Sequence, residues 1–233
     1  MTPDMLSSAR RIAGLLLLVL LCAAPTPGVG QQADPDPARF KEAIDRFEHW
    51  DTQNAFPAQG VLFVGSSSIV RWPTADRFPG LPVINRGFGG SHISDVNHYI
   101  EQTVLKYSPD VIVFYAGNND INAGKSPQQV FEDYRQFTDA VHARKRDTEI
   151  IYVSSHPSMS RWYRWPEMQE ANALIRKYSE ADPRRHYADI APAMLGSDGR
   201  PQPHLFVADG LHLSPAGYDA WTPIVAKAIE AVR

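Results

Sequence analysis

An unbroken apolar run of strand length, Val-Ile-Val-Phe-Tyr at residues 111–115, is the feature that most limits how this chain can fold. A strand that is apolar on both faces is typical of a parallel sheet, because helices cover both sides of such a sheet. Residues 61–64 form a second apolar run, and further candidate strands follow at residues 83–85, 149–154 and 186–190. The pattern therefore predicts a five-stranded sheet.

Helix-like segments separate these strands. Their apolar residues are spaced by three and four, and two of them begin with a capping serine followed by proline, Ser126 and Ser214. Strands that alternate with helices predict a parallel sheet covered on both faces, which is a three-layer α/β/α fold. The predicted helices are residues 38–51, 94–107, 126–145, 166–180 and 214–232.

Residues 1–30 predict a secretory signal peptide. Two arginines precede an apolar run at residues 12–24, and a segment rich in proline and glycine follows. The apolar run is shorter than the roughly 20 residues that cross a bilayer as a helix. Cleavage near Gly28 or Gly30 would remove Cys22, the only cysteine, so the exported chain could form no disulfide. We expect a periplasmic or extracellular protein with no stable membrane span once the leader is removed.

Composition limits what the rest of the chain does. Residues 31–37 predict a flexible spacer and residues 38–233 one domain, with 43% hydrophobic residues in the whole chain to supply a core. The formal net charge of -3 argues against a nucleic-acid surface. The histidines lack the spacing of a metal site, and the glycines lack that of a dinucleotide fingerprint, so we expect neither a metal nor a cofactor.

Four polar loops carry the chemistry. The first three follow predicted strands and read Gly-Ser-Ser-Ser (65–68), Asn-Arg-Gly-Phe-Gly-Gly-Ser (85–91) and Gly-Asn-Asn-Asp (117–120). The fourth, Ala-Asp-Gly-Leu-His (208–212), precedes the last helix. Ligands bind at the carboxyl ends of the strands in such sheets, so we expect the loops to form one site. A serine that attacks an ester needs a base, and the base must itself be oriented. The aspartate and histidine of the fourth loop are suited to that task.

In this order the four blocks resemble the SGNH hydrolases, also called the GDSL esterase and lipase family. The resemblance extends from residue 61 to residue 218 and implies a flavodoxin-like sheet. It also implies that Ser67 is the nucleophile, with Asp209 as the acid and His212 as the base.

One position departs from the family pattern. Ser66 stands where the family usually has the aspartate of its GDSL motif. That aspartate is not the acid of the triad, so the implied mechanism is unaffected. The choice of Ser67 over Ser66 and Ser68 then depends on its position two residues after Gly65.

The resemblance further implies an oxyanion hole formed by the backbone N–H groups of Ser67 and Gly90 and the side-chain amide of Asn119. Three neutral donors aimed at one point stabilise the negative charge of a tetrahedral intermediate. We also expect substrate contacts from His156, which follows the fourth strand, and from Trp162 in an aromatic loop. That loop could equally do no more than cover the sheet.

Each block alone has an ordinary explanation, such as a turn closed by serines or a helix cap. Together they predict a serine esterase of the carboxylesterase or acetylesterase type, with acetylated carbohydrates as candidate substrates. The loops are short and leave little buried space for a long acyl chain, which favours short acyl groups. Alternatives are a lysophospholipase or thioesterase of the same family, a non-catalytic carbohydrate-binding protein, and a scaffold tethered by its leader.

Overall fold

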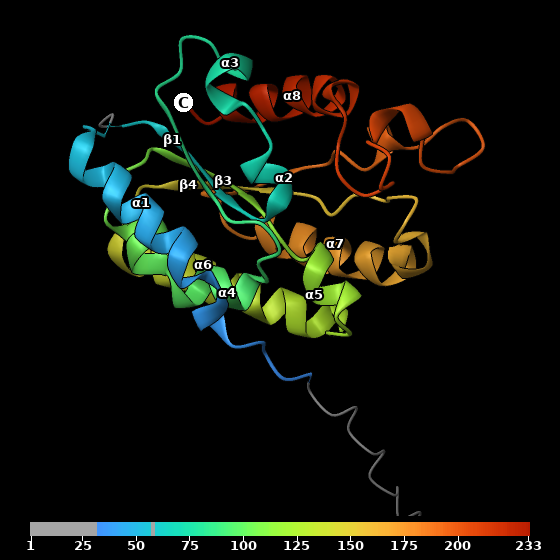
Figure 1. The fold of residues 1–233 in the computed structure, drawn as a ribbon, viewed down its shortest axis with the longest axis horizontal. Coiled ribbons are helices and arrows are strands. Elements are labelled where there is room, and N and C mark those ends of the chain that lie inside the picture. Colours follow the sequence, from blue (N-terminus) through green and yellow to red (C-terminus); the bar gives the residue numbers. More distant parts are fainter. Residues whose placement is uncertain (1–31, 57–58) are drawn as a thin grey trace, which may run out of the picture. The chain divides into compact units, whose positions relative to one another are not determined.

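The protein is built around a five-stranded parallel sheet, seen in a computed structural model that describes residues 32–56 and 59–233 (Figure 1). The strand order is β2-β1-β3-β4-β5, the order of flavodoxin-like sheets, so the predicted fold class is confirmed. The strands are β1 (Val61–Gly65), β2 (Val83–Gly87), β3 (Val111–Tyr115), β4 (Glu149–Val153) and β5 (Arg185–Ala188).

Helices cover both faces of the sheet (Figure 1). Side chains of a strand alternate in direction, so Leu62 and Val64 face one side while Val61 and Phe63 face the other. The first side packs against α1, α4, α6 and α7, and the second against α2 and α8. The helices are α1 (Lys41–Gln53), α2 (Ser67–Val70), α3 (Thr74–Arg77), α4 (Ile93–His98), α5 (Asn118–Asn122), α6 (Pro127–Arg144), α7 (Trp165–Ser179) and α8 (Pro215–Glu230).

Serine caps start two of the long helices where the sequence predicts them. The hydroxyl of Ser126 accepts the N–H of Gln129, and the Gln129 side chain accepts the N–H of Ser126 at 3.0 Å, which makes a capping box at the start of α6. The hydroxyl of Ser214 accepts the N–H of Gly217 at 3.2 Å at the start of α8. These contacts stabilise helix ends on opposite faces of the sheet.

Three elements differ from the sequence prediction. The helix expected at residues 94–107 is divided into α4 and a π-helical turn, Glu101–Leu105, and the Thr103 hydroxyl donates to the Tyr99 carbonyl at the junction. Such bonding from a threonine to the preceding turn bends helices. The last strand ends at Ala188, because the N–H of Ile190 donates to a serine side chain and not to a neighbouring strand. The expected loop at residues 117–120 begins the short helix α5.

The segment before α1 contacts the rest of the domain. Gln129 donates to the Gln32 carbonyl at 3.2 Å, and the Tyr99 hydroxyl donates to the Pro37 carbonyl at 3.0 Å. The predicted leader, residues 1–30, lies outside the described residues, and the predicted boundaries at residues 30 and 37 stay predictions. In the part of the chain that the structure describes, none of the helices has the length and apolar character needed to cross a membrane.

Candidate active site

Ser67 lies at the carboxyl edge of the sheet because the chain turns sharply at Gly65. The φ angle of Gly65 is 136°, and a Cβ atom there would lie 1.9 Å from the carbonyl oxygen of Tyr115 in β3. Only glycine fits such an approach of two strands. The N–H of Ser66 donates to the same carbonyl at 2.9 Å, and the N–H of Phe88 donates to the Gly65 carbonyl at 2.8 Å. These bonds hold the start of α2 at the end of β1.

The three consecutive serines have different surroundings. Ser66 and Ser68 are each 5% exposed, whereas Ser67 is partly exposed. The Ser67 Oγ atom lies 3.1 Å from Nε2 of His212. Of the three, Ser67 is therefore the serine whose hydroxyl meets the predicted base.

Asp209 and His212 lie in the loop before α8, close to Ser67. Oδ2 of Asp209 lies 2.6 Å from Nδ1 of His212, while Oδ1 accepts the backbone N–H of His212 at 2.9 Å and that of Leu211 at 2.8 Å. These hydrogen bonds, that from the His212 side chain first, hold the pKa of the Asp209 carboxyl well below its usual range. An ionised Asp209 can only accept, so Nδ1 of His212 carries a hydrogen and the neutral ring presents an unprotonated Nε2 to Ser67.

The glycine loop after β2 lies on another side of Ser67. A Cβ atom built on Gly89 would lie 3.8 Å from Cβ of Ser67, whereas one built on Gly90 would meet no atom within 4 Å. Gly90 has a φ of 86°, a left-handed conformation that favours glycine. The loop thus brings backbone close to the serine with no side chain between them. The assignment of the Gly90 N–H to the oxyanion hole stays a prediction.

Asn119 comes to the site from the first turn of α5, and its side-chain amide is held at both ends. Nδ2 donates to Oγ of Ser66 at 2.8 Å and to the carbonyl of Ser91 at 3.0 Å. Oδ1 accepts from Nη1 of Arg161 at 2.9 Å. No sequence pattern singles out Arg161 within the aromatic loop, although that loop follows β4 at the same edge of the sheet.

A cavity of about 20 Å³ lies beside the serine. His156 lines it and is fully buried, with Nδ1 donating to the Pro157 carbonyl at 2.9 Å and the ring stacked on Tyr115. Burial lowers the pKa of His156 to about 4, so this ring is neutral near pH 7. Trp162 is not among the lining residues. It packs against the core and lies beneath the guanidinium of Arg200, so its predicted contact with substrate stays a prediction.

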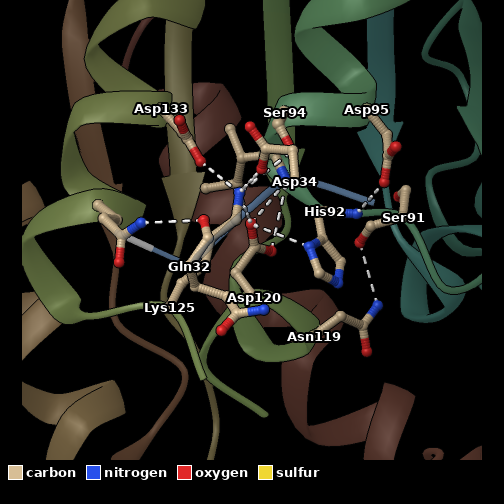
Figure 2. A network of polar contacts seen from close by, with 12 residues as sticks. Gln32, Asp34, Ser91, His92, Ser94, Asp95, Asn119, Asp120, Lys125 and Asp133 are labelled. Carbon is tan, nitrogen blue, oxygen red and sulfur yellow. Dashed lines mark hydrogen bonds and ion pairs between the residues drawn. The ribbon is translucent and has the colours of Figure 1, made fainter. Parts of the chain in front are cut away.

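A buried ion cluster lies next to the two loops that carry Ser91 and Asn119 (Figure 2). The ammonium of Lys125, whose side chain is 2% exposed, lies 2.5 Å from Asp34, 3.2 Å from Asp120 and 2.6 Å from Asp133. Its Nζ atom also donates to the Ser94 hydroxyl at 3.1 Å.

Asp120 joins the two loops, because it follows Asn119 directly and accepts the N–H of Ile93 from the first turn of α4. Burial raises the pKa of the Asp120 carboxyl, and the charge of Lys125 opposes that shift. The cluster therefore fixes the relative position of the β2–α4 and β3–α5 connections.

Within residues 32–56 and 59–233, no group of three or more histidine, cysteine, aspartate and glutamate side chains is arranged to hold a metal ion. What the site presents is a hydroxyl, an oriented imidazole and several hydrogen-bond donors. Such a set can take a proton from a hydroxyl and stabilise a negatively charged oxygen.

Comparison with known proteins shows which proteins this chain resembles. The model of the GDSL-like lipase/acylhydrolase family matches residues 60–220. Platelet-activating factor acetylhydrolase IB subunit alpha1 of Pongo abelii is 28% identical over 204 residues, which is 83% of each chain. The human protein of that name is 27% identical over 210 residues, covering 86% of this chain and 84% of its own.

Solved structures show the same fold. A GDSL-like lipase from Bacteroides thetaiotaomicron superposes with a TM-score of 0.70 at 22% identity, covering 82% of this chain and 98% of its own. A carbohydrate esterase family 3 protein from Talaromyces cellulolyticus gives a TM-score of 0.59 at 17% identity, covering 74% of this chain and 97% of its own.

Proposed function

The chain belongs to the GDSL-like lipase/acylhydrolase family, and from that premise we propose that it is a serine ester hydrolase acting on short acyl groups through an acyl-enzyme. The observation that carries the proposal is the line of contacts from Asp209 through His212 to Ser67, with distances of 2.6 Å and 3.1 Å. A carboxylate, an imidazole and a hydroxyl in this order make a serine nucleophilic near neutral pH.

The proposed reaction starts when Nε2 of His212 takes the hydroxyl proton as Oγ of Ser67 attacks the ester carbonyl. The carbonyl oxygen gains a negative charge, which the N–H groups of Ser67 and Gly90 and the amide of Asn119 stabilise. The N–H of Ser67 suits this role because it belongs to the first turn of α2, where amides have no partner within the helix.

The protonated His212 then gives its proton to the leaving alcohol, and the acyl group stays on Ser67. A water molecule attacks this acyl-enzyme while His212 takes one of its protons; His212 then returns that proton to Oγ of Ser67 as the bond to the acyl group breaks and the acid is released. Asp209 keeps the imidazole in one tautomer and stabilises its positive charge during both steps.

A preference for short acyl groups follows from the small space beside Ser67. The cavity of about 20 Å³ is little more than the roughly 10–15 Å³ that one water molecule needs. An acetyl methyl group fits a space of this order, whereas a longer chain would remain in water and gain no burial energy. The names of the curated relatives, which are acetylhydrolases, support the same acyl group.

A series of 4-nitrophenyl esters with 2 to 12 acyl carbons tests the proposal. We expect kcat/KM to be highest at two to four carbons, and acetylated oligosaccharides then test the alcohol side. The Ser67→Ala variant should be inactive on every ester while remaining folded. A steady rise of kcat/KM up to eight or more carbons, about tenfold for each two methylenes, would instead indicate a lysophospholipase-like channel.

We also propose that the protein is exported after loss of residues 1–30. The proposal is supported by the order of arginines, apolar run and small residues in the sequence. Mass spectrometry of the intact protein from fractionated cells tests it. A mature terminus near residue 29 or 31 in the exported fraction is expected, and a full-length chain retained on membranes would contradict it.

A further inference from the structure

Arg161 is the residue of the aromatic loop that reaches the catalytic cavity. Its Nη1 atom donates to Oδ1 of Asn119 at 2.9 Å and to the carbonyl of Asn118 at 3.2 Å. Burial lowers the pKa of its guanidinium. Among the described residues Arg161 thus places its charge on the amide of Asn119 and not on an acidic partner.

This contact acts together with the Ser91 carbonyl to set which way the Asn119 amide points. An asparagine side chain can be turned by 180°, which exchanges its accepting oxygen and its donating nitrogen. A guanidinium has only donors, so it can bind the oxygen alone. With Oδ1 held by Arg161, Nδ2 must point to the opposite side, toward Ser66 and the Ser91 carbonyl. The reversed amide would set two donors against each other at Arg161 and would leave Oδ1 facing the Ser91 carbonyl, an acceptor against an acceptor.

The positive charge also makes the amide a better donor. Hydrogen bonds with one charged partner are stronger than neutral ones, and bonds in a chain polarise one another. The chain here runs from the Arg161 guanidinium through the Asn119 carboxamide to the Ser66 hydroxyl. A developing oxyanion would replace the Ser66 hydroxyl as the acceptor of the Asn119 N–H. A neutral hydroxyl gives up this hydrogen bond more easily than a carboxylate would.

We propose that Arg161 is a positioning residue of the oxyanion hole, which fixes the orientation of the Asn119 amide and strengthens its N–H toward the tetrahedral intermediate. The inference rests on the proposed serine esterase function. It gives the loop after β4 a part in transition-state stabilisation, whereas the sequence suggested only substrate contact or cover for the sheet.

A double-mutant cycle tests the proposal, using Arg161→Met, Asn119→Ala and the double variant with 4-nitrophenyl acetate. Loss of one oxyanion donor lowers kcat by about 100-fold to 1,000-fold, and this is expected for Asn119→Ala. Arg161→Met should lower kcat by about 10-fold or more, as for loss of one charge-assisted hydrogen bond, with KM changed less than about twofold. In the Asn119→Ala background the same Arg161→Met change should have almost no further effect, because its target is gone.

Arg164→Met is the matched control. Arg164 lies in the same loop but pairs with Glu167 at 3.2 Å, so this variant should keep wild-type kcat. Arg161→Lys should fall between wild type and Arg161→Met, because an ammonium supplies the charge without the planar fork. If Arg161→Met fails to fold, the same double-mutant cycle is measured with Arg161→Lys in its place. The side-chain amide signals of Asn119 in ¹⁵N NMR should also shift in Arg161→Met and stay unchanged in Arg164→Met.

Two results would overturn the inference, and both differ from a failure of the proposed function. In one, the fold losses in kcat of Arg161→Met and Asn119→Ala multiply in the double variant, which means that the two residues act independently. In the other, Arg161→Met raises KM and leaves kcat unchanged, as expected for a residue that only binds substrate. Failure of the proposed function itself would appear as activity that survives in Ser67→Ala, which the same assays measure.

Discussion

Replacing Lys125 with methionine should destabilise the protein strongly, because the lysine neutralises two carboxylates that have little access to water, those of Asp120 and Asp133. The ammonium contacts Asp34, Asp120 and Asp133 at 2.5–3.2 Å, and the side chain of Asp120 is fully buried (Figure 2). Removing one partner of a buried ion pair costs about 3–5 kcal/mol, since an uncompensated charge remains. Asp34 is half exposed and adds no more than about 1 kcal/mol to that sum.

Equilibrium unfolding in urea measures this loss. Trp72 and Trp221 are buried in the core on the α8 side of the sheet and provide a fluorescence signal. We expect Lys125→Met to lower the unfolding free energy by about 3–5 kcal/mol with an unchanged dependence on urea. Adding Asp120→Asn should restore part of the loss, because it removes the buried charge that the lysine neutralised.

The loss should also depend on pH. Burial raises the pKa of Asp120 in the folded protein, and without Lys125 it must rise further. When the pKa of a carboxyl is higher in the folded protein than in the unfolded chain, the unfolding free energy falls as pH rises from the unfolded pKa through the folded pKa. The deficit of Lys125→Met should therefore be larger at pH 7 than at pH 4.5.

Asp34→Asn and Asp36→Asn provide matched controls from the same segment. Asp34→Asn should lower stability by about 1 kcal/mol or less, as for a partly exposed pair. Asp36 caps the turn at Pro37–Phe40, and asparagine caps equally well, so Asp36→Asn should be neutral. A loss below about 1 kcal/mol in Lys125→Met, or a loss that stays constant from pH 4.5 to pH 7, would refute the reasoning.

Three further predictions concern the site. A fluorophosphonate probe should label the wild-type protein at Ser67 and should not label Ser67→Ala; labelling that persists there and disappears in Ser66→Ala or Ser68→Ala would move the nucleophile. Asp209→Asn should lower kcat/KM for 4-nitrophenyl acetate less than His212→Ala does, since the Asn side chain can still accept the Nδ1–H; an equal or greater loss would show that the carboxylate charge is indispensable. His156 has a folded pKa of about 4 against about 6.5 in the unfolded chain, so the unfolding free energy should fall as pH is lowered, by about 2 kcal/mol at pH 5. Urea titrations between pH 7 and pH 5 should show a flatter dependence for His156→Gln, and an unchanged slope would assign the effect to other groups.

The sheet could be predicted from the sequence because its central strands, β1 and β3, are continuous apolar runs that end at glycine or a polar loop. Val111–Tyr115 and Val61–Gly65 are buried along their whole length, as such runs require. The break in the helix after His98 could not be read from periodicity, because the apolar spacing continues through it. At the break the Thr103 hydroxyl bonds to the preceding turn, a side-chain contact that apolar spacing does not encode.

For the site, the motifs located the side chains of the proposed triad but not those that hold the surrounding loops. Ser67 and His212 are far apart in sequence, yet each has a distinctive local pattern, and the structure places them within hydrogen-bonding distance. Arg161 and Lys125 have no such pattern. A lysine between glycine and serine is typical of an exposed turn, and only the packing of four separate segments makes Lys125 buried. Contacts of this kind depend on the path of loops, which hydrophobic spacing does not encode.

The distance between Ser67 and His212 along the chain has a consequence for protein synthesis. The serine is made 145 residues before the histidine, and the loop that carries the histidine leads directly into α8. Trp221, Val225 and Ile229 of that helix pack on the sheet last, because a growing chain leaves the ribosome from its amino end. Until then the serine has no base, and a hydroxyl without one does not attack esters. In the proposed mechanism a chain whose α8 has not yet docked is therefore harmless to the esters around it, and ester cleavage by a nascent protein reports that α8 has docked.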